Sequence, residues 1–393
     1  MTLFLDGQLG ISASSGAAAA QQVSFPDGTQ FNTAQSLGPR NRIINGAMAI
    51  DQRNVGASIS VNNTSTFSVD RFFVQNNYSN TVTAQQVTAV PNSTFSYSVK
   101  LTNGTSISTF NTQLLWQHRI EGYNIADLGY GTSAAQYCTL SFWVQSSVTG
   151  LYGGSLNNSP QSYVFTYNIN VANTWQYVTI TIPPNVANAF GNTTNGVGMY
   201  VVWDLGSGPA FETPAGSWTT GDYKRTSSCI HWNATAGATL YITGVQLEIG
   251  TVATPFERRL YGTELQLCQR YYENISNGIT TYNATSSAAK ASVNMFVPKR
   301  GTMSIGLISG TTWYFQTMAS TFASGSNGYV GTGINTGPTS ITQYGGSVIN
   351  SQTILFDLVA PSTLPTGMGY MFFGSNNLNS ALTGVGMYVS SEL

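Results

Sequence analysis

Apolar and polar residues alternate in a series of short runs between residue 42 and about residue 257, and clusters of Asn, Gly, Ser and Pro separate the runs. Successive side chains of a β-strand point to opposite faces, so each run predicts a strand with one buried and one exposed face. Seven or eight such strands are typical of an antiparallel two-sheet jelly roll. The predicted strands are RFFVQ (71–75), SYSVKLT (96–102), NTQLLWQHRI (111–120), YCTLSFWVQS (137–146), WQYVTITI (175–182), GMYVVWDL (198–205) and LYITGVQLEI (240–249).

The pattern changes at both ends of this region. Residues 1–40 contain SASSGAAAAQQ and several turn residues with little periodicity, which predicts an extended arm. Alternation resumes in a second, smaller β-domain at 291–300, 303–309, 311–317, 353–360 and 384–393, with long polar loops between these runs. We therefore expect an all-β chain with an N-terminal extended arm at 1–40, an antiparallel jelly-roll β-sandwich at 41–258, a short helical junction at 259–273 and a C-terminal β-domain at 274–393.

The stretch YITGVQLEIGTVATPFERRLYGTELQLCQRYYE (241–273) contains the last predicted strand of the sandwich and then the junction. By strand parity, Tyr241, Val245, Leu247 and Ile249 share the core face. Beyond Pro255, the spacing of Leu265, Cys268 and Tyr271 predicts a short helix that Thr263 caps. We expect the charged residues of this stretch to pair with one another or across subunits and so to fix the orientation of the two domains. The junction residues are Glu257, Arg258, Arg259, Cys268 and Arg270, with Glu264 and Glu273 as further pairing groups.

Two predicted strands carry aromatic residues on the face opposite the core. In 137–146 this face holds Tyr137 and Trp143, and in 175–182 it holds Trp175 and Tyr177, each among hydroxyl or amide side chains. An aromatic ring can stack on the apolar face of a sugar while neighbouring amides and hydroxyls bond to the sugar's own hydroxyls. These four residues are the candidate glycan-binding residues. The alternative is that they lie beneath a loop or in a subunit contact.

Composition narrows the function classes. Charged residues make up 7% of the 393 residues, the net charge is -1, and the 14 Lys and Arg are scattered, so no basic stripe for nucleic acid is expected. The sequence contains no apolar run long enough to predict a membrane-spanning segment. Its first residues lack the basic region that is typical of a cleaved secretion signal, so such a signal is not expected. Cys138, Cys229 and Cys268 are widely spaced, which favours free buried thiols over a metal site or a disulfide.

Residue types that carry catalysis are scarce. The two histidines, His118 and His231, lack partners at metal-ligand or triad spacing, so no metal site and no cofactor are expected, although a calcium site of Asp, Asn and backbone oxygens stays open. Glycoside hydrolysis needs two carboxylates across a bond, and Asp204, Glu212 and Asp222 are candidates in polar loops. We expect the chain not to be an enzyme, with a polysaccharide depolymerase as the catalytic alternative.

Several stretches resemble one family of proteins. NRIINGAMAIDQR (41–53), FSVDRFFV (67–74) and the 241–273 stretch are similar to sequences of bacteriophage tail-fibre and related virion proteins that have a carbohydrate-binding-module-like jelly roll. Supporting matches are RIEGYNIADL (119–128), CTLSFWVQS (138–146), NTWQYVTITIP (173–183) and the closing GMYVSSEL (386–393).

The resemblance implies a non-catalytic structural component of a phage virion, commonly a homotrimeric tail fibre that recognises host cell-surface polysaccharide. It also implies that residues 1–40 contact other virion proteins. It does not separate a fibre from a head-decoration or tail-collar protein without receptor binding. The resemblance identifies no glycan-contact residue in this sequence, so the four aromatic candidates depend on strand parity alone.

Overall fold

The computed structural model describes residues 39–158, 160–275, 279–285, 288–300 and 387–392, together with further strands that lie outside these ranges. The chain divides into two compact units, Met1–Arg40 and Asn41–Leu393. In the first unit, β1 (Phe4–Asp6) pairs with β2 (Gly10–Ser12), and β3 (Val23–Ser24) pairs with β4 (Gln30–Phe31), both antiparallel. The predicted arm therefore contains two short hairpin-like pairs.

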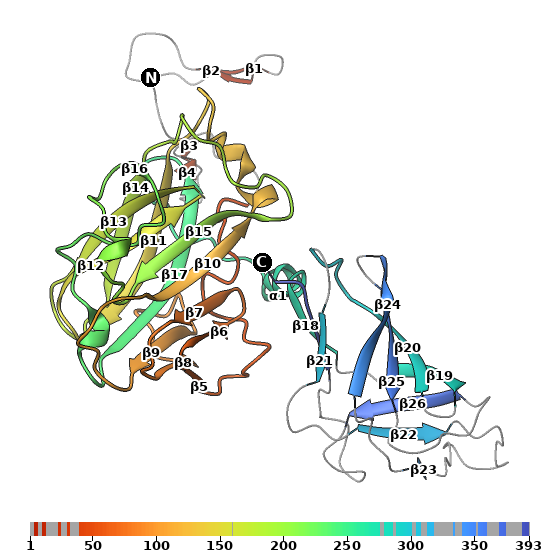
Figure 1. The fold of residues 1–393 in the computed structure, drawn as a ribbon. Helices are drawn as coiled ribbons and strands as arrows, with labels where there is room; N and C mark the ends of the chain where they lie inside the picture. The colour runs from red at the N-terminus through yellow and green to blue at the C-terminus, as the bar shows by residue number, and fades with distance from the viewer. Residues whose placement is uncertain are drawn as a thin grey trace. The chain divides into compact units, whose positions relative to one another are not determined.

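Two antiparallel sheets form a sandwich from residue 59 to residue 249 (Figure 1). The six-stranded sheet has the order β14-β11-β17-β9-β8-β5, with bounds β5 (Ile59–Val61), β8 (Val82–Val87), β9 (Ser98–Asn103), β11 (Cys138–Ser146), β14 (Gln176–Ile182) and β17 (Thr239–Ile249). The seven-stranded sheet has the order β16-β13-β12-β15-β10-β7-β6, with bounds β6 (Thr64–Val69), β7 (Phe72–Asn76), β10 (Leu114–Glu121), β12 (Gly150–Asn157), β13 (Gln161–Ile169), β15 (Val197–Asp204) and β16 (Trp218–Thr220). The predicted all-β fold class is confirmed.

All seven predicted strands of this region are present, but the expected total of seven or eight was too low. The missed strands are β5, β6, β8, β12, β13 and β16. Several of them are rich in Gly, Ser, Thr, Asn or Gln, such as GLYGGSLN in β12 and TSTFSV in β6. These residues are also typical of loops, so their alternation was not visible.

Large aromatic side chains fill the space between the sheets. Phe72 stacks on Trp116 with ring centroids 4.6 Å apart, and Trp203 lies 4.9 Å from Trp116 and 5.5 Å from Phe142. All four are at most 1% exposed. Cys138, Leu140, Phe142 and Val144 are fully buried, so the predicted core face of β11 is confirmed.

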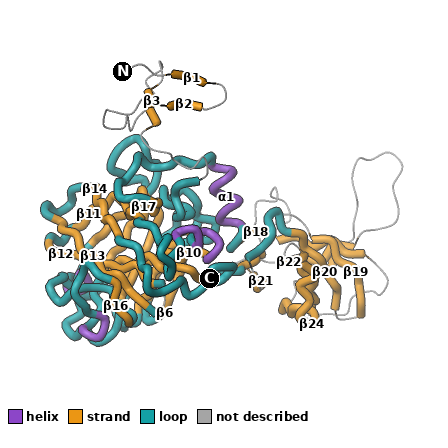
Figure 2. The backbone as a smooth tube through the Cα atoms, turned by 90° about the horizontal axis from the view of Figure 1, so that it is seen from above, coloured by secondary structure: helices purple, strands orange, loops and turns teal. Residues whose placement is uncertain are grey.

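The junction contains α1 (Tyr261–Gln269), the one α-helix among the described residues (Figure 2). The helix begins after Leu260, and no side chain caps it, so the predicted cap at Thr263 was wrong: this residue lies in the first turn. Cys268 and Tyr271 are fully buried and pack with Ile44 and Ile50 in a small apolar cluster. Short 3-10 helices span Gly122–Asn124, Ala126–Leu128, Pro209–Phe211 and Trp232–Ala234.

Two further sheets follow the junction. One contains β18 (Tyr272–Ile275), β27 (Met387–Ser390) and β21 (Ser304–Leu307) in the order β18-β27-β21. The other has the order β23-β22-β26-β19-β20-β25-β24, with bounds β19 (Ile279–Thr285), β20 (Ala288–Asn294), β22 (Trp313–Thr317), β23 (Gly333–Ile334), β24 (Ser340–Asn350), β25 (Thr353–Val359) and β26 (Gly369–Gly374). The polar segment between 318 and 352, expected as a loop, thus contains the long strand β24.

Candidate functional site

Three of the four predicted glycan-binding residues lie on the outer face of the six-stranded sheet. Trp143 of β11 pairs across the ladder with Tyr177 of β14, and their ring centroids are 5.2 Å apart. Trp175 precedes β14 and lies 6.1 Å from the ring of Tyr241. Tyr177 is 44% exposed and Trp143 is half-buried. These four rings form the aromatic face, which we define as Trp143, Trp175, Tyr177 and Tyr241.

Tyr137 lies away from this face. It is 46% exposed and directly precedes β11, six residues before Trp143. At ~3.4 Å per residue, these two residues are separated by roughly 20 Å along the strand. The structure therefore brings Trp143, Trp175 and Tyr177 together and places Tyr137 apart from them.

The outward position of Tyr241 corrects the predicted face of the last strand. Opposite Ser141 and Trp143, β17 contains one extra residue, because Ser141 pairs with Gln246 and Trp143 with Thr243. This bulge places Gly244 at φ +64°, where a Cβ would lie 2.7 Å from the Phe95 ring. Side chains before the bulge therefore have the opposite parity to those after it. A glycine inside a strand pattern was the signal for this irregularity.

A cleft with a volume of about 540 Å³ lies on the outer face of the seven-stranded sheet. It was not predicted. Its floor follows β10, and its sides come from β7, β15, β12 and the loop after β16. The residues that line it are Gln75, Gln113, Leu115, Gln117, Arg119, Asn157, Pro160, Tyr200, Gly221, Asp222 and Lys224. We call this surface the β10 cleft.

Amide groups form much of the floor of the β10 cleft. Gln117 Nε2 donates a hydrogen bond of 3.1 Å to Gln75 Oε1. Gln113 Oε1 is buried and has no hydrogen-bond partner among the described residues. A buried acceptor without a partner carries a desolvation cost.

The strand register places Arg119, Tyr200 and Asn157 side by side. Arg119 of β10 pairs with Tyr200 of β15, which pairs in turn with Asn157 of β12. The Arg119 guanidinium lies 4.3 Å from the ring centroid of Phe73 and 5.5 Å from that of Tyr200. Asp222 accepts a hydrogen bond of 2.6 Å from Asn157 Nδ2 and pairs with Lys224.

The carboxylates considered for hydrolysis have structural partners. Asp204 is 2% exposed, lies 3.3 Å from Arg225 Nη1, and accepts hydrogen bonds from the backbone N–H groups of Gly206 and Ser207. Its burial raises its pKa to about 6. Glu212 lies 3.5 Å from the Nε of the same Arg225. Asp204 and Glu212 therefore share one buried guanidinium.

Neither histidine has a metal-binding environment in the described residues, where no group of three His, Cys, Asp or Glu side chains is close enough to hold an ion. His231 stacks on Phe110 with centroids 3.6 Å apart, and its Nδ1 lies 2.9 Å from Arg225 Nη1. The three cysteines are buried free thiols, and burial raises the pKa of Cys138 to about 12. No helix among the described residues is long and apolar enough to cross a membrane.

The predicted junction charges connect α1 to the sandwich. Arg259 lies 3.3 Å from Glu264 and 3.7 Å from Glu257, so these three pair within the junction. Arg270 instead binds Glu121 at the end of β10, at 2.6 Å. Arg258 is exposed, and no ion pair involves it in the described part of the chain. Glu273 pairs with Lys299.

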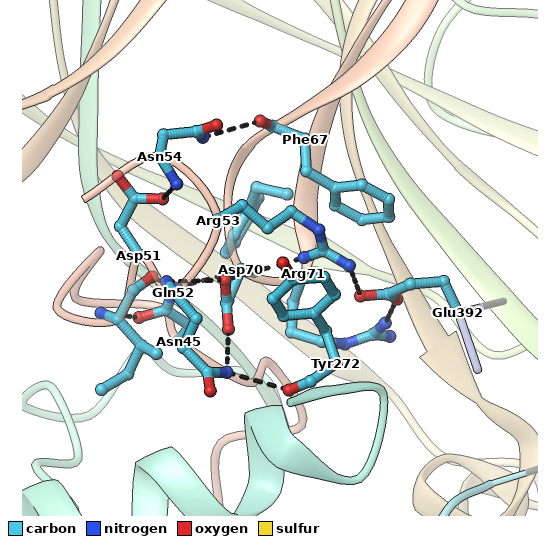
Figure 3. Close-up of polar contacts among 12 residues, drawn as sticks. Asn45, Asp51, Gln52, Arg53, Asn54, Phe67, Asp70, Arg71, Tyr272 and Glu392 are labelled. Atoms are coloured by element: carbon cyan, nitrogen blue, oxygen red, sulfur yellow. Dashed lines mark hydrogen bonds and ion pairs between the residues drawn. The ribbon is translucent and has the colours of Figure 1, made fainter. Parts of the chain in front are cut away.

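A second charged cluster binds residue 392 to the sandwich (Figure 3). The Glu392 carboxylate lies 2.7 Å from Arg53 Nη2 and also pairs with Arg71. The Arg53 guanidinium lies between the rings of Phe67 and Tyr272, at 4.0 Å and 3.8 Å. We call Arg53, Arg71 and Glu392 the Glu392 clasp.

Asp70 lies beside this clasp and is 1% exposed. It accepts hydrogen bonds from the backbone and side chain of Gln52 and lies 3.6 Å from Arg53 Nη1. Burial raises the pKa of Asp70 to about 6, although Arg53 acts in the opposite direction.

No protein-family model matches the chain, and no curated protein matches it. Among solved structures, the enzymatically active domain of tailspike protein 4 of bacteriophage CBA120 is 15% identical, with a TM-score of 0.28 over 53% of this chain and 21% of that one. TmCBM61 in complex with beta-1,4-galactotriose is 9% identical, with a TM-score of 0.26 over 54% of this chain and all of that one. A CBM4 structure is 14% identical, with a TM-score of 0.27 over 51% of this chain and all of that one. Similarities this weak do not assign a function.

Proposed function

We propose that this protein binds glycans without cleaving them and that the β10 cleft is its binding site. The observation that carries the proposal is the lining of the cleft, which combines the half-buried ring of Tyr200 with the amides of Gln75, Gln113, Gln117 and Asn157. A sugar ring stacks on an aromatic face, and its hydroxyls both donate to and accept from amides.

The aromatic face on the six-stranded sheet is a second candidate surface. Its rings are partly exposed, and Gln145, opposite Tyr241 in the ladder, offers an amide beside them. The β10 cleft is a concave surface of about 540 Å³, the shape that is typical of small-ligand sites, so it is the first candidate.

We further propose that the protein is part of a phage virion, most simply a homotrimeric tail fibre that binds host cell-surface polysaccharide. The sequence similarity at 41–53, 67–74 and 241–273 supports this proposal. In this role residues 1–40 bind other virion proteins, and linked copies of a weak glycan site gain avidity. A head-decoration or tail-collar protein is the alternative, and antibody labelling of particles distinguishes them: labels over the capsid contradict the fibre.

The glycan proposal is tested by applying the purified full chain to an array of bacterial surface polysaccharides. We expect saturable binding that Tyr200→Ala weakens about tenfold, since a lost aromatic contact costs ~1.5 kcal/mol. Tyr123→Ala is the matched control, because Tyr123 is 63% exposed in the 3-10 helix Gly122–Asn124 and does not line the cleft. Equal binding by both variants, or no binding by the wild type, overturns the assignment. Release of reducing ends from a bound polysaccharide favours a depolymerase instead.

A further inference from the structure

A second concave surface lies beside the β10 cleft. Its volume of about 480 Å³ is within the range of small-molecule sites, roughly 300–1,000 Å³. It is formed by the turn between β5 and β6, the turn after β7 and the loop that leads into β10. We call this surface the rim pocket, and its lining residues are Asn63, Asn77, Tyr78, Ser79, Ser106, Ile107, Ser108, Thr109, Asn111 and Thr112.

The rim pocket and the β10 cleft are adjacent where β7 ends and β10 begins. Gln75 of β7 lines the cleft, and Asn77, which follows β7, lines the pocket. Residues two apart in an extended chain point to the same face and are separated by ~7 Å. The backbone N–H of Asn77 donates a hydrogen bond of 3.1 Å to the carbonyl oxygen of Gln113, another residue of the cleft lining. A saccharide that lies along β10 and continues past Gln113 therefore reaches the rim pocket.

Hydrogen bonds to the backbone hold the segments of the rim pocket together. The N–H of Asn63 donates to the carbonyl oxygen of Tyr78 at 3.0 Å, and the Tyr78 hydroxyl donates to the carbonyl oxygen of Thr112 at 2.9 Å. The N–H of Ile107 donates to the carbonyl oxygen of Asn233 at 2.8 Å, which fixes the middle of the longest segment. The pocket is therefore formed before a ligand binds, which reduces the entropy that binding costs.

The side chains that line the rim pocket are uncharged, and most of them are polar. The exposed ones are Asn63, Asn77, Ser79, Ser106, Ser108, Thr109 and Asn111. Amides and hydroxyls both donate and accept hydrogen bonds, as the hydroxyls of a sugar do. A charged substituent would lose water without gaining a counterion from this lining, so the pocket favours uncharged sugars.

We propose that the rim pocket is a second saccharide subsite, continuous with the β10 cleft, and that the ligand is a polysaccharide chain long enough to occupy both. Uncharged, hydroxyl-rich sugars lie in the rim pocket, and a ring further along the same chain stacks on Tyr200 in the cleft. Recognition then depends on a stretch of several sugars rather than on one terminal sugar. This inference rests on the proposed glycan binding and specifies the size of the ligand and its chemistry outside the cleft.

The test is calorimetry of the full chain with a size series of oligosaccharides, prepared by partial hydrolysis of the polysaccharide that binds on the array. Beyond the shortest oligosaccharide whose binding Tyr200→Ala weakens, we expect longer chains to bind about tenfold more tightly, the gain for one or two hydrogen bonds. Asn77→Ala with Asn111→Ala removes this gain and leaves the affinity for the short oligosaccharide unchanged. Because the lining is uncharged, the gain is expected to be equal at about 0.05 M and about 0.5 M NaCl.

Asn168→Ala with Asn170→Ala is the matched control, because both residues are exposed and line neither surface. It is expected to bind every length like the wild type, and unfolding midpoints establish that each variant is folded. Equal affinity of the wild type for short and long chains, a gain that persists in the rim-pocket variant, or a gain that salt abolishes overturns the inference while glycan binding stands. Failure of the wild type to bind any oligosaccharide or the parent polysaccharide counts against the proposed function itself.

Discussion

At the residue scale, the stretch NRIINGAMAIDQR (41–53), which resembles sequences of virion proteins, has a structural role in the sandwich. A Cβ on Gly46 would lie 2.1 Å from the Val245 carbonyl oxygen, so only glycine permits this approach to β17. Asn41 Nδ2 donates to that same carbonyl, and its Oδ1 accepts from the backbone N–H of Leu247. These residues therefore join the start of the sandwich to its last strand and lie outside the β10 cleft.

The two candidate glycan surfaces are distinguished by one double variant. Trp143→Ala with Trp175→Ala is expected to change glycan affinity less than twofold, because these rings lie on the opposite outer face of the sandwich from the β10 cleft. Calorimetry with the array-selected saccharide measures the affinity, and light scattering measures the oligomer mass. A tenfold loss of affinity at unchanged mass moves the site to the aromatic face. Loss of assembly instead identifies a subunit contact.

His118 makes stability depend on pH. It is 1% exposed, its ring lies 4.7 Å from that of Phe72, and burial lowers its pKa well below 6.5. The unfolded chain therefore binds a proton that the folded chain excludes, and stability falls as pH decreases below about 6.5. This loss reaches roughly 2 kcal/mol at pH 5 for a side chain that stays neutral when folded.

Urea unfolding of the wild type and His118→Leu between pH 7.5 and pH 5 measures this contribution. Asp70 and Asp204, with pKa values of about 6, act in the opposite direction as they protonate, but they are present in both proteins. The difference between the two curves therefore isolates His118, and on going from pH 7.5 to pH 5 the variant is expected to gain roughly 2 kcal/mol of stability relative to the wild type. Parallel curves contradict a neutral buried imidazole.

At the element scale, strand parity was enough to predict the core face of β11 but not the outward position of Tyr241. Parity assumes an uninterrupted strand, and the bulge at Gly244 violates that assumption. The β10 cleft could not be predicted, because Gln75, Gln117, Tyr200 and Asn157 come together only through the order of strands in the sheet. Sequence spacing carries no information about that order.

The charged residues of the junction were recognised in sequence, but the partners of several were not. Arg270 binds Glu121, which lies 149 residues earlier. Glu392, which closes the clasp, lies in the predicted strand run 384–393, but its pairing with Arg53 and Arg71 was not predicted. Distant partners of this kind depend on the tertiary fold, whereas the pairing of Arg259 with Glu264 is local.

The Glu392 clasp is expected to stabilise the fold strongly. Glu392→Gln leaves Arg53 and Arg71 without their shared carboxylate, and removal of one partner from a buried ion pair typically costs about 3 kcal/mol or more. Asp127→Asn is the matched control, because its pair with Arg42 is half exposed and is expected to contribute less than about 1 kcal/mol. Denaturant unfolding compares the two, and equal losses contradict a stabilising clasp.

At the scale of the whole molecule, the motifs that resemble virion proteins meet in one region. Residues 41–53, 67–74, 259–273 and 391–392 share hydrogen bonds and ion pairs around α1 and the Glu392 clasp. The proposed binding site lies on the outer face of the seven-stranded sheet. Arg119, which is part of its lining, lies two residues before Glu121, the last residue of β10. In the proposed function, this framework holds the sheet in place and the cleft residues determine which glycan binds.

The most direct test of the central claim is a crystal structure of the full chain with a saturating array-selected oligosaccharide. The account predicts an intact sugar chain along β10, with one ring on Tyr200 and hydroxyls at the glutamine amides. Density over Trp143 and Tyr177 alone, or a cleaved product beside Asp204 and Glu212, contradicts it.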